Sequence, residues 1–231
     1  MLDRIAEGRT DLVYDWVEAG GSPTAQTGGT GLANWCAYYG DVSGLKYLLT
    51  RGEVLTALGP DLGLRGAAFH GHWRLVEFLL ERGADPDAAD PETQETPLHL
   101  ALCKRESYTH EQVVRVLLAF GAAPNAVTRP GVETGCFMRD ARTRGETPLH
   151  RAAAFGTTAA IKLLLAAGAD LQAKDAVGDT PLSWASWALR GTEALRLLCY
   201  GPHQVREGRL SMEAYLIGRP LGERAAGPGA A

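Results

Sequence analysis

One short motif recurs along this chain and limits its possible folds more than any other feature. The sequence Glu-Thr-Pro-Leu-His occurs at residues 95–99 and again at 146–150, and Asp-Thr-Pro-Leu-Ser occupies 179–183. Degenerate copies lie upstream, around 33–40 and 63–72. A repeat with a period of this kind predicts a solenoid, because a single unit cannot bury its apolar face without a stacked neighbour.

Each copy carries the signals that begin and end a pair of short helices. Thr is a good N-cap, and Pro fits the first helical position, where its missing N–H has no helical partner. The apolar residues that follow recur at helical spacing. A glycine then ends the second helix in a left-handed conformation. These glycines are Gly20, Gly52, Gly83, Gly121, Gly168 and Gly201.

The Thr-Pro-Leu-His-x-Ala-Ala motif, with Gly-Ala-Asp near the end of the unit, strongly resembles the ankyrin repeat. The resemblance covers roughly residues 1–203. It implies an all-α solenoid of about six stacked helix pairs with β-hairpin-like loops, in one domain at 1–221 ahead of a flexible tail at 222–231. The expected repeats are 1–30, 31–61, 62–94, 95–144, 145–178 and 179–205, followed by a cap helix at 206–221.

Composition narrows the classes of function. The net charge of −4 lacks the basic excess expected of a nucleic-acid or membrane-surface binder. No stretch approaches the roughly 18 apolar residues of a membrane span, and acidic residues near Met1 argue against a signal peptide. The four cysteines form no CxxC pair. We therefore expect a reduced, monomeric cytoplasmic protein.

Motifs that carry chemistry are weak. The resemblance implies that His99 and His150 tie one repeat's turn to the next by hydrogen bonds. His70 and His72 form a pair without further metal ligands, and His110 lacks the second histidine of a zinc-protease helix. The chain has no Gly-rich phosphate loop and no nucleophile elbow. We expect no cofactor, no metal and no catalytic residue.

The largest departure from the repeat is an insertion at residues 127–144, about 14 residues longer than a regular connection. Arginines outnumber acids within it, and Cys, Phe and Met follow one another at 136–138. The resemblance places the insertion at a hairpin, as a finger beside the concave face; a solvated loop also fits. We expect the Cys-Phe-Met run to tuck against the solenoid or contact a partner. The stacked helices are expected not to need the insertion.

The resemblance also implies that a protein or peptide partner binds the concave face, with no nucleic acid or membrane involved. Aromatic and arginine side chains dominate binding hot spots. For Phe69, Tyr38 and Phe155 a packing role between neighbouring helices is favoured, whereas binding is favoured for Trp35 and for the Trp184–Trp187 pair. The candidate partner-binding residues are Trp35, Tyr38, Tyr39, Phe69, His70, Phe137, Arg139, Arg142, Arg151, Phe155, Trp184 and Trp187.

Two alternatives remain open on the sequence. One is a small-ligand-binding or enzymatic variant, in which the 127–144 insertion closes over a small acidic ligand held by Trp35, Arg139, Asp140, Arg151 and Trp184. The other is a structural scaffold whose departures from the repeat are neutral. Fold alone does not decide between such functions.

Overall fold

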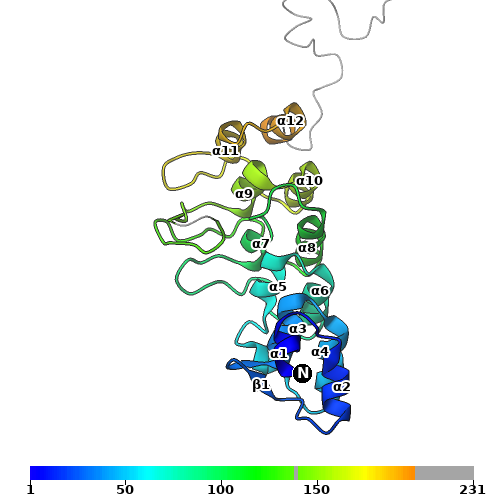
Figure 1. The fold of residues 1–231 in the computed structure, drawn as a ribbon. Helices are drawn as coiled ribbons and strands as arrows, with labels where there is room; N and C mark the ends of the chain where they lie inside the picture. The colour runs from blue at the N-terminus through cyan, green and yellow to red at the C-terminus, as the bar shows by residue number, and fades with distance from the viewer. Residues whose placement is uncertain (138–139, 201–231) are drawn as a thin grey trace, which may run out of the picture.

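The helices of this protein stack in pairs along one axis (Figure 1). The computed structural model describes residues 1–137 and 140–200. The first helices of the pairs are α1 (Leu2–Ala6), α3 (Leu32–Tyr39), α5 (Leu64–His70), α7 (Pro97–Leu100), α9 (Pro148–Phe155) and α11 (Pro181–Trp187). The second helices are α2 (Leu12–Glu18), α4 (Val42–Thr50), α6 (Trp73–Glu81), α8 (Tyr108–Ala119), α10 (Thr158–Ala166) and α12 (Thr192–Tyr200).

The stack has two unlike sides. From α5 onward, the first helices lie on one side, from which long loops project, and the second helices lie on the other (Figure 1). A short 3-10 helix, η1 (Leu55–Leu58), and an antiparallel pair of strands, β1 (Gln26–Thr27) and β2 (Thr30–Gly31), complete the described elements. The all-α solenoid predicted from the sequence is confirmed. The predicted cap helix at 206–221 and tail at 222–231 lie outside the described residues.

The motif residues cap the first helices as their chemistry suggests. The Thr147 N–H donates to Nδ1 of His150 at 3.1 Å, and Thr147 and His150 together form a capping box at the start of α9. Because Nδ1 accepts, Nε2 carries the proton, and it donates to the Asp179 carbonyl oxygen at 3.0 Å. His99 makes the same connection to the carbonyl oxygen of Glu146, at 3.2 Å. The prediction that these histidines join neighbouring repeats is therefore confirmed.

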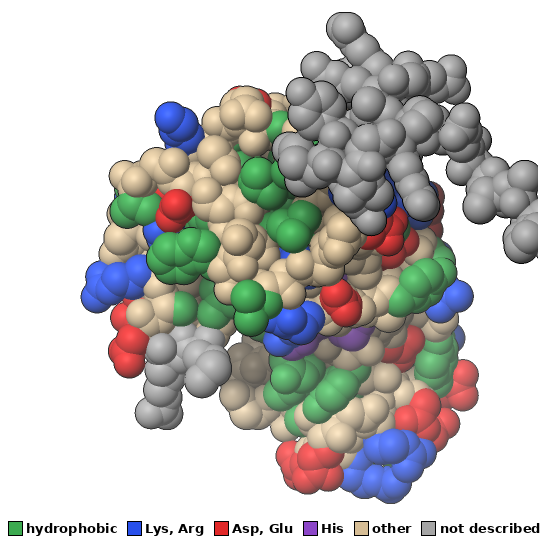
Figure 2. Space-filling view, turned by 90° about the horizontal axis from the view of Figure 1, so that it is seen from above, with side chains coloured by type: hydrophobic (Ala, Val, Ile, Leu, Met, Phe, Trp, Pro, Cys, Tyr) green, Lys and Arg blue, Asp and Glu red, His purple; other side chains and the backbone are tan. Residues whose placement is uncertain are grey.

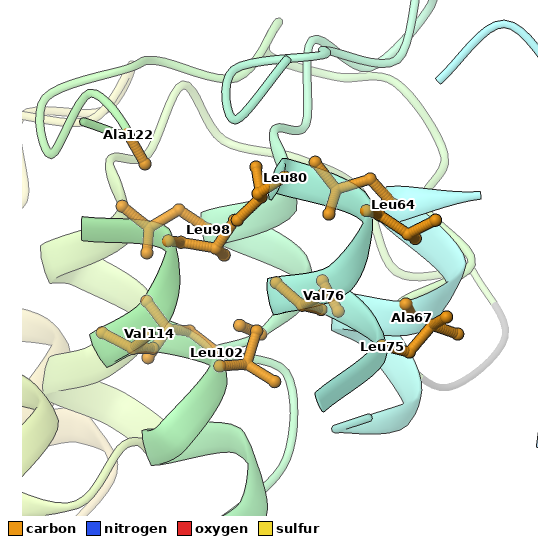
Figure 3. Packing of buried hydrophobic residues seen from close by; sticks show 14 of the residues in the cluster. Leu64, Ala67, Leu75, Val76, Leu80, Leu98, Leu102, Val114 and Ala122 are labelled. Atoms are coloured by element: carbon orange, nitrogen blue, oxygen red, sulfur yellow. The ribbon is translucent and has the colours of Figure 1, made fainter. Parts of the chain in front are cut away.

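The core runs through the stack between the two rows of helices. Leucine, valine and alanine side chains from α5, α6, α7 and α8 interleave there, and Leu64, Val76, Leu98 and Val114 have no exposed surface (Figure 3). Burying one such Leu or Val side chain contributes about 1.5–3 kcal/mol. Neighbouring pairs thus share one continuous core. Among the described residues, no helix is long and apolar enough to cross a membrane.

Replacing Gly168 by Val is expected to lower the free energy of unfolding by about 2 kcal/mol. Gly168 follows α10 with φ +88°, a conformation that a β-branched residue adopts only with strain. No atom lies within 4 Å of the position that a Cβ would occupy, so the loss would come from the backbone and not from a clash. Urea unfolding measures this difference.

The matched control is Gly66→Ala, inside α5. Its added Cβ also meets no atom within 4 Å, but the position is helical, so the change should stabilise the protein by about 0.5–1 kcal/mol. Equal stability of Gly168→Val and the parent would contradict the left-handed helix end.

Candidate functional site

A buried ion-pair cluster joins three segments of the chain. Arg151 on α9 is fully buried, and its Nη2 lies 2.5 Å from a carboxylate oxygen of Glu95 and 2.5 Å from one of Glu146. Its Nη1 donates to the carbonyl oxygen of His99 at 3.2 Å. We call Glu95, Glu146 and Arg151 the Arg151 cluster. One guanidinium therefore holds together two successive Thr-Pro turns.

Electrostatics keep both carboxylates of the cluster ionised. Burial alone raises the pKa of Glu146, but the charge of Arg151 and hydrogen bonds from Arg144 N–H and the Thr128 hydroxyl outweigh it and lower the pKa to about 2. Burial likewise raises the pKa of Glu95, and Arg151 brings it below its usual value. The cluster consequently carries two negative charges around one positive charge at neutral pH.

The insertion is an ordered hairpin where the structure describes it. Residues 131–134 run antiparallel to 141–143, with a bridge between Glu133 and Arg142. The Thr134 N–H donates to the Ala141 carbonyl oxygen at 2.9 Å. Backbone hydrogen bonds of this kind fix the path of a chain that the repeat pattern leaves unspecified.

The insertion packs onto the helix stack. The Thr134 hydroxyl lies 2.8 and 2.9 Å from the two carboxylate oxygens of Glu95 and donates to this group. Cys136 is buried, and the half-buried Phe137 ring lies with its centroid 5.2 Å from that of Phe155. Cys136 and Phe137 thus tuck against the solenoid, one of the two outcomes predicted for this run. The insertion therefore contacts the Arg151 cluster, and the expectation that the stacked helices do not need it stays a prediction.

An open depression of about 700 Å³ forms where two irregular segments of the chain meet. One segment is the insertion, and the other is the connector at 101–107 between α7 and α8. Aromatic rings, two thiols, one Lys and one Asp line it: Phe69, Cys103, Lys104, Gly135, Cys136, Phe137, Asp140, Ala141 and Phe155. Such a lining suits an apolar side chain that carries a polar or charged neighbour.

Beside the depression lies an aromatic row, which we define as Trp35, Tyr38, Tyr39, Phe69 and His70, on α3 and α5. The Tyr38 ring centroid is 5.0 Å from that of Tyr39 and 4.9 Å from that of His70. The Phe69 and His70 centroids are 5.2 Å apart. Tyr38 and Tyr39 remain 52% and 39% exposed, so the row leaves large ring surfaces in contact with solvent.

A second apolar surface lies at the far end of the described stack. Figure 2, viewed from that end, shows hydrophobic side chains among other side chains on the face of the stack. Trp187 is 77% exposed. Trp184 is half-buried instead, and its Nε1 donates to Oδ2 of Asp175 at 3.1 Å. Of this predicted indole pair, Trp187 is the one that presents most of its ring.

The structure corrects or qualifies several of the predicted contact residues. Arg151 is wrong as a surface residue, since it has no exposed surface and its guanidinium is engaged in internal ion pairs. Trp35 is only partly exposed and packs against the core. Arg142 is exposed, with Nη1 donating to the Gly131 carbonyl oxygen at 2.8 Å. Arg139 lies outside the described residues.

Sequence reasoning missed Glu95, Cys103 and Lys104. One signal was present: a glutamate precedes Thr-Pro in both full motifs, and the position of Arg151 is filled by Leu100 in the neighbouring copy. A charged residue in place of an apolar one on a buried helix requires a partner. No local pattern in the sequence indicated that Cys103 and Lys104 of the connector line the depression, because the depression forms only when the insertion folds against the connector.

Comparison with known proteins identifies the same kind of repeat that the Thr-Pro-Leu-His motif predicted. The family model described as ankyrin repeats, in three copies, matches residues 33–128, 64–175 and 130–207. These matches together cover well over half of the chain. Ankyrin repeats are in general protein-interaction modules, so the family favours a protein partner.

Three relatives illustrate the range of proteins that carry similar segments. Mouse palmitoyltransferase ZDHHC13 is 30% identical over 189 residues, covering 67% of this chain and 28% of that protein. Human ankyrin repeat and SOCS box protein 16 is 29% identical over 234 aligned positions, covering 87% and 51%. Human SH3 and multiple ankyrin repeat domains protein 2 is 35% identical over 133 residues, covering 56% and 6%. The chain thus spans at most about half the length of these relatives.

Proposed function

This chain belongs to the ankyrin-repeat family, and we propose that it is a protein- or peptide-binding module that uses the aromatic row, the adjoining depression and the insertion. The exposure of Tyr38 and Tyr39 within a run of contacting rings carries the proposal. Large rigid rings bury much area on binding and lose little rotamer entropy.

The depression gives the partner a preferred chemistry. Phe69, Phe137 and Phe155 offer ring surface, and Nζ of Lys104 lies 4.7 Å from the Phe69 ring centroid. A peptide that inserts an aromatic or branched apolar side chain there and places a carboxylate near Lys104 would satisfy both features. The aromatic row would then contact the neighbouring part of the same peptide.

Binding is expected to depend on exposed rings of this surface and not on exposed rings elsewhere. Peptides selected from a random displayed library against the whole chain would be titrated against Tyr38→Ala, Phe155→Ala and Tyr108→Ala. Truncation of a central ring should cost about 2 kcal/mol, a loss of about 30-fold in affinity. Tyr108 is 70% exposed at the start of α8, on a second helix, and serves as the control.

Melting temperatures of the three variants would be compared first, because Phe155 is half-buried and its truncation also affects packing. The proposed surface would be contradicted if the peptides bound Tyr38→Ala as tightly as the parent and bound Tyr108→Ala more weakly.

The alternative of a small-ligand or catalytic pocket closed by the insertion has less support. Arg151, one of its three charged residues, is fully engaged with two carboxylates. Asp140 is exposed at an open depression. No observation on the described residues favours this alternative over partner binding.

A further inference from the structure

Two cysteines that are distant in sequence meet in the depression. Cys103 belongs to the connector between α7 and α8, and Cys136 belongs to the insertion. They are 8% and 7% exposed, and both line the solvent-open depression. Hydrogen peroxide that enters the depression therefore meets both residues.

The Arg151 cluster positions both thiols. Sγ of Cys103 accepts a hydrogen bond from Nη1 of Arg151 at 3.3 Å. The Cys136 N–H donates at 3.1 Å to the hydroxyl of Thr134, which in turn is bonded to Glu95. The two cysteines lie on the wall of the same depression, and the Cys103 S–H donates to the His99 carbonyl oxygen at 3.4 Å. The Cys103 sulfur is thus bonded to the cluster directly, and the Cys136 backbone is connected to it through Thr134.

This arrangement divides the roles of the two thiols. The neighbouring Cys103 side chain lowers the pKa of Cys136, against the effect of burial, and the charge of Arg151 lowers it further. Burial raises the pKa of Cys103, and the neighbouring Cys136 raises it more, against the charge of Arg151. Cys136 is thus the better thiolate, and Cys103 keeps its proton. A thiolate is the form that attacks peroxides.

We propose that Cys103 and Cys136 form a hydroperoxide-reactive thiol pair that closes to an intramolecular disulfide and fastens the insertion to the α7–α8 connector. In the first step the Cys136 thiolate attacks one peroxide oxygen, the O–O bond breaks, and hydroxide leaves. In the second step the Cys103 sulfur attacks the sulfenic sulfur of Cys136. The S–OH bond breaks, and the hydroxyl group leaves with the Cys103 proton as water. The peroxide is the two-electron oxidant.

The other cysteines lack this environment. Burial raises the pKa of Cys36 to about 12, with Asp41 as the next contribution. Cys199 is exposed on α12. Cys36 should accordingly react slowly with peroxide, and Cys199 is removed in the test because an exposed thiol can join two chains.

The test uses the whole chain carrying Cys199→Ser, which leaves three of the four cysteines. The folded protein is treated with hydrogen peroxide, unfolded in the presence of N-ethylmaleimide, and digested without reduction. We expect two of the three thiols to be lost and one peptide pair to be linked through Cys103 and Cys136. Cys36 should be recovered as the alkylated thiol. Dithiothreitol added after the peroxide and removed before alkylation should restore all three thiols.

Cys103→Ser should abolish the link and leave Cys136 as a sulfenic acid that dimedone traps. Cys36→Ser, the matched control, should form the link at the parental rate. If one of these variants folds poorly, the Cys103–Cys136 peptide pair from the Cys199→Ser protein still decides the proposal. Recovery of three thiols after treatment, or a disulfide that includes Cys36, would overturn it. So would a Cys103–Cys136 link that appears only when peroxide is added in urea.

Discussion

Replacing Arg151 by Met is expected to destabilise the protein by about 3–5 kcal/mol. The substitution leaves the buried carboxylates of Glu95 and Glu146 without the cation that lies 2.5 Å from each of them. Removing one partner of a buried ion pair leaves an uncompensated charge, and the cost falls in this range. For a chain of this size the melting temperature should fall by about 10 °C. Urea and thermal unfolding measure both quantities.

The control is Arg9→Ala. Arg9 pairs with Asp11 at 2.7 Å, but both side chains are more than half exposed, so the free energy of unfolding should hardly change. Adding Glu95→Gln and Glu146→Gln to Arg151→Met should recover part of the stability, since neutral amides leave no unpaired charge. An Arg151→Met protein that melts with the parent would show that the cluster is not buried as described.

Acidification is expected to destabilise the protein from about pH 6.5 downward. Burial, with the charge of Arg151 adding to it, lowers the pKa of His99 to about 3 from 6.5. Between these values the unfolded chain binds a proton that the folded chain does not, so stability falls as pH falls. At pH 4.5 this one group accounts for about 3 kcal/mol, since one pKa unit corresponds to about 1.4 kcal/mol.

Glu146 acts in the same direction at lower pH. Its folded pKa of about 2 lies below the ordinary 4.5, so its stabilising contribution is present above pH 4.5 and is lost as pH falls towards 2. Urea unfolding at pH 7, 5.5 and 4.5 checks the His99 window separately. His99→Gln should be less stable at pH 7, because the bond to the Glu146 carbonyl oxygen is altered, yet should show a flatter dependence between pH 6.5 and 4.5. Equal free energies of unfolding for the parent at pH 7 and 4.5 would contradict the buried neutral imidazole.

The sequence by itself determined the helix pairs, because the signals for them are local. Thr147 caps α9, Pro148 occupies its first position, and Gly168 ends the following helix, all within one repeat. Each of these effects depends on residues a few positions apart. The histidine bonds between repeats were accessible only through the family resemblance, since His150 Nε2 reaches Asp179, 29 residues away.

Only the tertiary structure decided that Arg151 is buried and that the insertion packs against the Arg151 cluster. The helical period places Arg151 on the inner helix, but it does not say what covers that helix. The residues that cover Arg151 are distant in sequence. Glu95, which binds Arg151, lies 56 residues away, and Thr134, which donates to Glu95, lies 39 residues from Glu95. The desolvation of three charges is offset by their mutual attraction once these segments meet, and a long-range balance of that kind leaves no local pattern in the sequence. The same meeting of insertion and connector brings Cys103 beside Cys136, at positions where the sequence shows two unrelated cysteines.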